Sequence, residues 1–461
     1  MNPLQDHSRR RFIGRACAAV GATGMLSALA QVRMIGALAA DTAPTDYKAL
    51  VCLFLYGGND SNNLLVPTDA TNYGYYSAAR TVLALDQASL LPIAPKTYSD
   101  GRTWGLHPSL VEVQSLFGAG NLAILGNTGT LVQPVNLTQY KSGLGLPSQL
   151  FSHADQQVQW QSSISNQPFT TGWGGRLADI VNALNSNPKI SMSVSVAGQN
   201  SFQVGNTVSQ FAVNPSGAVV LSGTGTSGLT GTRYNAQQAI LTLQEQNLFE
   251  AAFGGSTTNA VASSQLLNTV LAAAPKLTTV FPTTSIASQL QMIARMIGAA
   301  PQLGLTRQVY FASLGGFDLH SDQLGAHATL FQQLSQALSA FNSATVELGV
   351  QDQVTTFTAS DFSRTFNTNG TNDGTAGSDH GWGSHHLIMG GAVKGGDIYG
   401  TIPLLELGGP EDTGRGRWIP TTSVDEYAAT LATWFGVSAT NLTTVLPNIG
   451  QFATTNLGFM G

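Results

Sequence analysis

The chain contains few charged residues for its length. Asp, Glu, Lys and Arg make up 10% of its 461 residues, whereas about a quarter is usual for a globular protein. Acidic residues (25) outnumber basic residues (20), and nucleic-acid binding requires clustered Lys and Arg to neutralise phosphates. The composition therefore excludes nucleic acid as the expected partner.

Two cysteines are too few for a disulfide-stabilised fold. Cys17 lies in an N-terminal segment that we expect to be removed, and Cys52 lies in the apolar run ALVCLFLY. The mature chain then has no internal disulfide, and Cys52 is expected to be a small core residue. The glycine pattern GxGxxG is absent after this run, which argues against a Rossmann-type NAD enzyme.

The N-terminus carries the pattern of an export signal. Residues 8–14, SRRRFIG, follow the twin-arginine pattern S-R-R-x-F-L-K in all but its last positions. A weakly apolar stretch over residues 16–30 and a small-residue cleavage site, Ala37-Leu38-Ala39, come next. We therefore predict a cleaved twin-arginine signal peptide over residues 1–39. The twin-arginine (Tat) translocase is then a partner during export, and the mature protein is expected to be periplasmic or secreted.

A membrane anchor is the alternative for this segment. Its apolar stretch is short and is flanked by Arg15 and Arg33, which disfavours a stable span of about 20 apolar residues. We expect no other segment to cross a membrane. Cleavage after Ala39 removes five arginines and one aspartate, which leaves 15 basic and 24 acidic residues and a net charge of −9.

The rest of the sequence alternates apolar runs with amphipathic segments. The runs ALVCLFLY, NLAILG, RQVYFASL, VTTFTAS and HLIM are predicted as strands, and helices are predicted near residues 106–117, 173–187, 234–252, 258–274, 284–299, 323–347 and 424–435. This alternation predicts an α/β fold with a mostly parallel central sheet. Residues 188–232, rich in Ser, Gly and Thr, are predicted as a small β-rich insertion, and residues 446–461 as a C-terminal tail.

Residue types that bind metals follow the predicted strands. They are Asp60, Asp318, His320 and Asp361 at strand ends, and Asp379, His380, His385 and His386 on the loop GSDHGWGSHH. Because neighbouring parallel strands lie about 4.8 Å apart, side chains at their carboxyl ends converge. Carboxylates held so close raise one another's pKa unless a cation neutralises them. A mixed His and Asp set suits Zn²⁺, Mn²⁺ or Fe better than Ca²⁺, and we predict one or two such divalent metal ions.

Each of these residues taken singly has a structural explanation. Asp60 can cap a helix that starts near Asn62, Asp318 and Asp361 can be turn residues, and a lone histidine is more often structural than a ligand. The set as a whole favours a metal site, because turns alone do not require acids at three strand ends with imidazoles beside them.

Several motifs together resemble those of one protein family. LFLYGGNDSNNLLVP, LHPSL, SHADQQVQW, GGFDLHSDQ, SDFSRT, SDHGWG and GGAVKGGDIYG follow one another over about residues 47–445, as the motifs of DUF1501 proteins do. Those are bacterial proteins commonly exported by the twin-arginine route, and in fold they resemble the alkaline phosphatase and sulfatase superfamily. The resemblance implies a three-layer, alkaline-phosphatase-like α/β sandwich over residues 47–445 and metal-dependent chemistry on phosphate or sulfate esters.

By this resemblance the metal ligands are Asp60, Asp318, His320, Asp361 and His380. Asp60 and Asp361 match acids that bind one metal, and Asp318 with His320 matches the pair that binds the other. His380 matches the last ligand best, with His385 and His386 as alternatives. Phe362 stands where the superfamily has a histidine, a departure that implies a weakened or missing second metal site.

The resemblance implies Ser152 and Arg364 as the catalytic groups. Ser152, in FSHADQQ, matches a nucleophile at a helix N-terminus; its alternative is an N-cap, with His153 on the helix surface. Arg364 is the implied anion-binding cation, and a surface salt bridge is its alternative. The sulfatase signature C-x-P-S-R is absent, so no formylglycine nucleophile is available.

Two functions follow from these observations. The first is an exported metal-dependent hydrolase of phosphate or sulfate esters, in which Ser152 or a water activated by the metal attacks an anionic ester substrate. The alternative is a non-catalytic periplasmic or extracellular protein on the same scaffold, which binds a glycan or assists assembly of exported polymers.

Overall fold

The computed structural model describes residues 46–461 apart from 186–187, 219–226, 242–246 and 275. The predicted twin-arginine segment, residues 1–39, lies outside the described residues and stays a prediction. Within the described part of the chain, no helix combines the length and the apolar character needed to cross a membrane.

Strands and helices alternate along the chain. The strands are β1 (Lys48–Leu55), β2 (Leu65–Pro67), β3 (Leu91–Ile93), β4 (Trp104–Leu106), β5 (Leu122–Gly129), β6 (Ser193–Ser195), β7 (Phe211–Asn214), β8 (Gly217–Ala218), β9 (Arg307–Leu314), β10 (Val354–Ser360), β11 (Ser384–Met389), β12 (Ile398–Tyr399) and β13 (Thr422–Ser423). The α-helices are α2 (Ser61–Leu64), α3 (Ala70–Arg80), α4 (Val111–Gly118), α5 (Leu137–Ser142), α6 (His153–Ser162), α7 (Trp173–Val181), α8 (Gly228–Leu241), α9 (Leu248–Ala273), α10 (Ser285–Gly298), α11 (Ala300–Leu303), α12 (Gln323–Glu347), α13 (Val424–Phe435) and α14 (Leu442–Val445). The helix predicted from residue 106 begins only at Val111, because Trp104–Leu106 pair with β2 and β3 instead.

A ten-stranded sheet forms the centre of the molecule, in the order β12-β5-β11-β10-β1-β9-β6-β7-β8 with β13 beside β5. β1 lies between β9 and β10 and runs parallel to both. Residues 49–55 are at most 2% exposed, as expected for a parallel strand that is covered on both faces. β11 runs antiparallel to β10 and to β5. The predicted α/β fold with a mostly parallel central sheet is confirmed.

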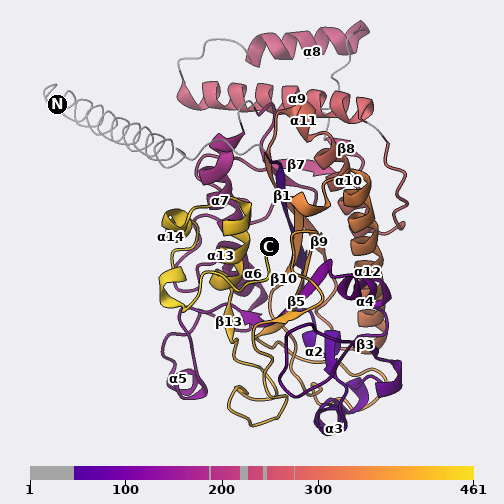
Figure 1. Cartoon of the computed structure of the whole chain (residues 1–461). Coiled ribbons are helices and arrows are strands. Elements are labelled where there is room, and N and C mark those ends of the chain that lie inside the picture. The colour runs from indigo at the N-terminus through magenta and orange to yellow at the C-terminus, as the bar shows by residue number, and fades with distance from the viewer. Residues whose placement is uncertain (1–45, 186–187, 219–226, 242–246, 275) are drawn as a thin grey trace, which may run out of the picture.

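Helices cover both faces of this sheet, which gives three layers (Figure 1). α6, α7, α13 and α14 lie on one face, and α4, α10 and α12 lie on the other. α12 packs against both α4 and α10. α8 and α9 pack on each other beyond the end of the sheet, outside these layers.

The strand register aligns the carboxyl ends of the three central strands. Leu55, the last residue of β1, lies opposite Leu314 of β9 and Ser360 of β10. The chain therefore leaves all three strands at one edge of the sheet, where ligands bind in folds of this class. Each of the three predicted acids follows one of these strand ends within a few residues.

Two segments that the sequence analysis set apart lie against this sheet. Within residues 188–232, β6 pairs parallel with β9 and with β7, and β7 pairs antiparallel with β8. These short strands therefore extend the edge of the central sheet. In residues 446–461, Phe459 is fully buried and Gly461 N donates to Ala392 O at 2.8 Å, so this segment packs on the domain.

Four histidines of the described part of the chain are buried: His107, His327, His385 and His386. Because an imidazolium loses its hydration inside the protein, burial lowers the pKa of each to about 3. His385 and His386, the alternatives to His380, belong to β11. His385 Nδ1 accepts from Asn127 N at 2.9 Å, and the His386 ring packs against Trp160 with centroids 4.6 Å apart.

We predict that mild acid destabilises the protein. These imidazoles titrate near 6.5 in the unfolded chain but near 3 in the folded one, so the unfolded state binds more protons between these pH values. The contribution of these histidines to the unfolding free energy is fully present above pH 6.5, and below that pH it falls by up to about 1.4 kcal/mol per pH unit for each histidine. Asp425, whose pKa burial raises to about 7, acts in the opposite direction but is a single group. Thermal unfolding followed by circular dichroism checks this; a midpoint that stays constant from neutral pH to about 4.5 would contradict it.

Candidate metal centre

A glycine turn lets the ends of β1, β9 and β10 touch. Gly57, just after β1, has φ of +112°, and a Cβ there would lie 2.3 Å from the backbone nitrogen of Asp318. Only glycine fits both the backbone conformation and the close approach. Gly57 N also donates to Asp361 Oδ1 at 3.2 Å. The residues that follow the three strands are therefore packed together at this edge.

Three imidazoles surround one carboxylate oxygen. The Nε2 atoms of His153, His320 and His380 lie 3.4, 3.0 and 3.4 Å from Asp318 Oδ1. His380 Nε2 also lies 3.1 Å from Nε2 of each of the other two rings. His153 begins α6, His380 comes from the loop after β10, and Asp318 and His320 follow β9. Three separate segments thus meet at one point, which brings together Asp318, His320 and His380 of the predicted ligands.

The other nitrogen of each ring is held by an oxygen. The three pairs are His153 Nδ1 with Asp361 Oδ2 at 2.6 Å, His380 Nδ1 with Phe151 O at 2.7 Å, and His320 Nδ1 with Asp379 Oδ1 at 3.2 Å. Carbonyl and carboxylate oxygens only accept, so this hydrogen-bond network assigns the proton of each neutral imidazole to Nδ1. Each Nε2 is then an unprotonated lone pair that faces its neighbours.

The backbone around His380 is built to hold this arrangement. Phe151 has φ of +71°, which is rare for a bulky residue, and its carbonyl oxygen accepts from His380. On the other side, His380 forms an antiparallel bridge with Arg364. A Cβ on Gly377 would lie 2.1 Å from the carbonyl carbon of His320. Backbone strain of this kind clusters at functional sites, where the surroundings fix a side chain.

The donor set suits a divalent metal ion. Among the described residues, His153, Asp318 and His380 form a group whose ligand atoms are close enough to share an ion. Their separations of 3.1, 3.4 and 3.4 Å match the edges of about 3.3 Å expected for ligands about 2.0–2.1 Å from a tetrahedral ion. Facing lone pairs beside a carboxylate repel one another unless a cation lies between them. An oxygen on Nδ1 is also the usual partner of a metal-bound histidine.

The surroundings shift the pKa values of the cluster residues in different directions. The hydrogen bond to Asp361 raises the pKa of His153, against the effect of burial, and so makes this imidazole more basic. Burial lowers the pKa of His380, which leaves its Nε2 free at neutral pH. Burial alone would raise the pKa of Asp318, but the hydrogen bond and charge of Arg364 outweigh it and lower that pKa. The carboxylate therefore stays ionised.

Asp361, a predicted ligand, lies behind the cluster. Its side chain is fully buried, and Oδ2 contacts both His153 Nδ1 and Gln157 Nε2, the latter at 2.7 Å. Oδ1 accepts from Gly57 N. These hydrogen bonds direct the carboxylate to the back of the His153 ring, so Asp361 orients a histidine of the cluster.

Asp60, another predicted ligand, also lies outside the cluster. It caps α2 by accepting from Asn62 N at 3.2 Å and forms an ion pair with the fully buried Arg80. Its Oδ2 accepts from Gln323 Nε2 at 2.5 Å. The carboxylate is 2% exposed, and protein donors occupy both of its oxygens.

The two residues predicted as catalytic contact protein atoms. Ser152 precedes α6, and its Oγ donates to Asp155 Oδ2 at 2.6 Å. The guanidinium of Arg364 is fully buried; Nη1 donates to Asp318 Oδ1 at 2.6 Å and to Gly57 O at 3.2 Å. Its position behind Asp318 makes it part of the support of the cluster.

Sequence reasoning missed His153 as a cluster residue and two arginines at the rim. Arg415 Nη1 lies 2.5 Å from Asp379 Oδ2. Arg417 Nε donates to His380 O at 2.8 Å, and its guanidinium lies 4.9 Å from the centre of the Phe151 ring. Both arginines are partly exposed. The available signal was the stretch GRGRW, which is unusually basic for this chain.

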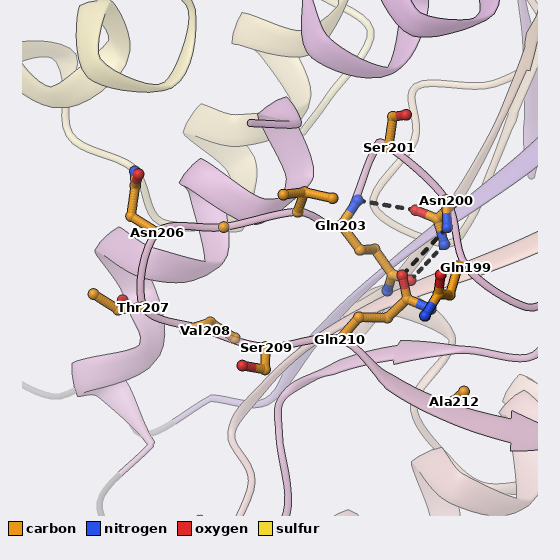
Figure 2. A pocket seen from close by; sticks show the side chains of 12 residues that line it. Gln199, Asn200, Ser201, Gln203, Asn206, Thr207, Val208, Ser209, Gln210 and Ala212 are labelled. Atoms are coloured by element: carbon orange, nitrogen blue, oxygen red, sulfur yellow. Dashed lines mark hydrogen bonds between the residues drawn. The ribbon is translucent and has the colours of Figure 1, made fainter. Parts of the chain in front are cut away.

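A separate hollow of about 610 Å³ lies in the loop between β6 and β7 (Figure 2). Amides and hydroxyls dominate its lining, and Asn200 Nδ2 donates to Gln203 Oε1 at 3.0 Å. The buried Asp179 carboxylate accepts from the backbone nitrogens of residues 206–208 at 2.6–2.9 Å, which fixes the loop. None of the described residues that line the hollow is charged, so it cannot recognise an anion by charge.

Comparison with known proteins gives one family and several distant structures. Residues 47–445 match the family described as "Protein of unknown function (DUF1501)". No curated protein is recognisably similar to the chain in sequence.

The chain is similar in architecture to solved structures of low sequence identity. One is a sulfatase from Pseudoalteromonas sp. (11% identity, 94% of this chain and 73% of that chain, TM-score 0.35). Another is the lipoteichoic acid synthase LtaP from Listeria monocytogenes (7% identity, 90% and 81%, TM-score 0.36). A third is Ps i-CgsB in complex with k-i-k-neocarrahexaose (8% identity, 87% and 74%, TM-score 0.35).

We predict that Asp361→Asn weakens metal binding without unfolding the protein. The amide keeps the size of the side chain but removes the charge that orients His153, and changes of this kind cost about 10–100-fold in metal affinity. Competition of a chromogenic chelator for Zn²⁺ measures the affinity. Asp373→Asn is the matched control, because Asp373 is fully exposed and accepts from Thr375 of its own loop. Equal affinities for the two variants would exclude Asp361 from the site.

Proposed function

The chain belongs to the DUF1501 family, and from this premise and the metal centre we propose that it is an exported metal-dependent hydrolase of phosphate or sulfate esters. The observation that carries the proposal is the convergence of three unprotonated Nε2 atoms on Asp318 Oδ1. These atoms could hold a cation at the carboxyl edge of an α/β sheet, where ligands bind in folds of this class.

His153, Asp318 and His380 would hold the ion. Two nitrogens and one oxygen favour Zn²⁺, Mn²⁺ or Fe over Ca²⁺. When bound, a divalent ion supplies Lewis acidity for the ester oxygen and lowers the pKa of water to about 7. The remaining steps fall to the side chains of the protein.

Water is the attacking group in this proposal, because Ser152 Oγ is engaged with Asp155. The oxygen of the water forms a bond to phosphorus or sulfur. The bond from that atom to the ester oxygen breaks, and the alcohol leaves with a proton. His320, the most exposed of the three imidazoles at 44%, can take a proton from the attacking water on its unprotonated Nε2 and pass that proton to the departing oxygen. Asp379, at its Nδ1, stabilises the protonated ring.

The rim arginines are suited to bind the charged end of the substrate. Arg415 and Arg417 extend from one loop to either side of the cluster, on Asp379 and on the His380 carbonyl. Guanidinium groups match the oxygens of phosphate and sulfate in pairs. The hollow in Figure 2 offers uncharged hydrogen-bonding groups, which suit a neutral ligand.

A non-catalytic binding or assembly protein is the second candidate, and that uncharged hollow is the observation that favours it. Such a protein would bind an anionic glycan through the same arginines without turnover. The enzyme must break the ester bond, whereas the binding protein need neither break it nor hold a metal ion.

We predict slow release of 4-nitrophenol from its phosphate or sulfate ester by the metal-loaded protein. Asp318→Asn should reduce this rate by more than the roughly 10–100-fold typical of a residue behind the ligands, because it removes a charged donor. Asp373→Asn should match the wild type. Metal-loaded protein that turns over neither ester nor their diester analogues would leave the binding protein as the better account.

We also predict export through the twin-arginine route, which the pattern SRRRFIG supports. Replacing Arg9 and Arg10 together by lysine should retain the precursor in the cytoplasm. Fractionation of cells that express either precursor checks this. Equal amounts of processed protein outside the cytoplasm from both precursors would contradict it.

A further inference from the structure

The family resemblance allows two ions, and the residues present do not fit the second. The carboxylate that would hold it, Asp60, is already neutralised. Arg80, on α3, contacts Oδ2 with Nη2, and both side chains are at most 2% exposed. Gln323 Nε2 reaches the same oxygen, and Asn62 donates twice to Oδ1 at 3.1 and 3.2 Å. Buried carboxylates with this many donors have no lone pair left for a cation.

The other possible ligands of a second ion are also engaged. Asp361 accepts from three donors, as described above. The next residue, Phe362, is an aromatic ring without a ligand atom. That ring fills space inside the cluster, with its centroid 4.7 Å from those of both His153 and His380.

Arg364 supplies a permanent cation at Asp318. Its Nη1 lies 2.6 Å from Oδ1, the oxygen that the three imidazoles also face. Nη2 donates to Ser378 O, and the side chain is fully buried. One carboxylate oxygen therefore lies between a fixed guanidinium on the inner side and the lone pairs of the histidines on the outer side.

The net charge of the carboxylates and guanidiniums around the site favours a single ion. Asp60, Asp318 and Asp361 carry −3 together, and the buried Arg80 and Arg364 carry +2, while Asp379 and Arg415 neutralise each other. One divalent ion makes this group net +1. A second would make it +3 in a largely buried space, where like charges repel strongly.

We infer that the site holds one metal ion, and that the guanidiniums of Arg80 and Arg364 occupy the place of a second cation. This inference rests on the proposed function, since it assigns the number of ions at the same centre. Arg364 is accordingly a positioning residue: it acts on the substrate only through Asp318.

The test counts ions in the mature chain. The protein is loaded with excess Mn²⁺, freed of unbound ion by gel filtration and analysed by plasma mass spectrometry and electron paramagnetic resonance. We expect one Mn²⁺ per chain with the spectrum of an isolated ion. Two per chain with an exchange-coupled spectrum would overturn the inference and leave the hydrolase intact. No uptake of Mn²⁺, Zn²⁺ or Co²⁺ would overturn both.

A pair of variants tests the role of Arg364 separately. In Arg364→Gln one fixed charge is lost, so we expect more than one Mn²⁺ per chain at saturation. Arg364→Lys keeps the charge and should still bind one. A folded Arg364→Gln protein that binds one ion would remove Arg364 from the account. If that variant fails to fold, the ion count of the wild-type chain still tests whether the site holds a single ion.

Discussion

The arrangement of the site depends on the carboxylate of Asp361. This buried group accepts from Gly57 N after β1, and from His153 and Gln157 on α6, while Asp361 itself directly follows β10. One side chain thereby joins two strands and a helix that are far apart in the sequence. Hydrogen bonds to an ionised acceptor are about twice as strong as neutral ones. The bond between Asp361 and His153 Nδ1 also fixes which nitrogen of His153 faces the cluster. Without the Asp361 carboxylate, no hydrogen bond would hold Nδ1 of His153, the first residue of α6, and direct its Nε2 toward Asp318.

Although the chain has few charged residues, two buried arginines balance carboxylates at the metal centre. Arg80 and Arg364 are buried, and each contacts one carboxylate, Asp60 or Asp318. Removing one member of a fully buried pair such as Arg80 and Asp60 typically costs about 3–5 kcal/mol, because the other charge is left uncompensated. Arg364 keeps Asp318 ionised beside three imidazoles, and the charges of both arginines are the basis of the inferred single ion. The chain therefore combines a low content of charged residues with ion pairs at the edge of its central sheet.

The sequence predicted the fold and the edge of the sheet that carries the site. Apolar runs such as ALVCLFLY had the length and composition of buried strands, and three of the predicted ligands, Asp318, His320 and His380, lie together. The predictions for Asp60 and Asp361 depended on what approaches each carboxylate from elsewhere in the chain. Arg80 and α6 do so here, and spacing along the sequence does not report such contacts.

His153 shows the same limit from the other direction. In the sequence it follows a possible N-cap, Ser152, and has the pattern of a helix-surface residue. Its role follows from where α6 starts, and that point is fixed by the strained backbone at Phe151 and by the buried Asp361. The departure at Phe362, by contrast, is visible in the sequence alone, and its ring now lies against His153 and His380.

The most direct test of the account is anomalous X-ray diffraction from crystals of the mature protein loaded with Zn²⁺, collected on both sides of the zinc absorption edge. The account predicts one anomalous peak, about 2.0–2.1 Å from His153 Nε2, His380 Nε2 and an oxygen of Asp318. Crystals with no peak among these three residues, or with a second peak beside Asp60, would contradict it.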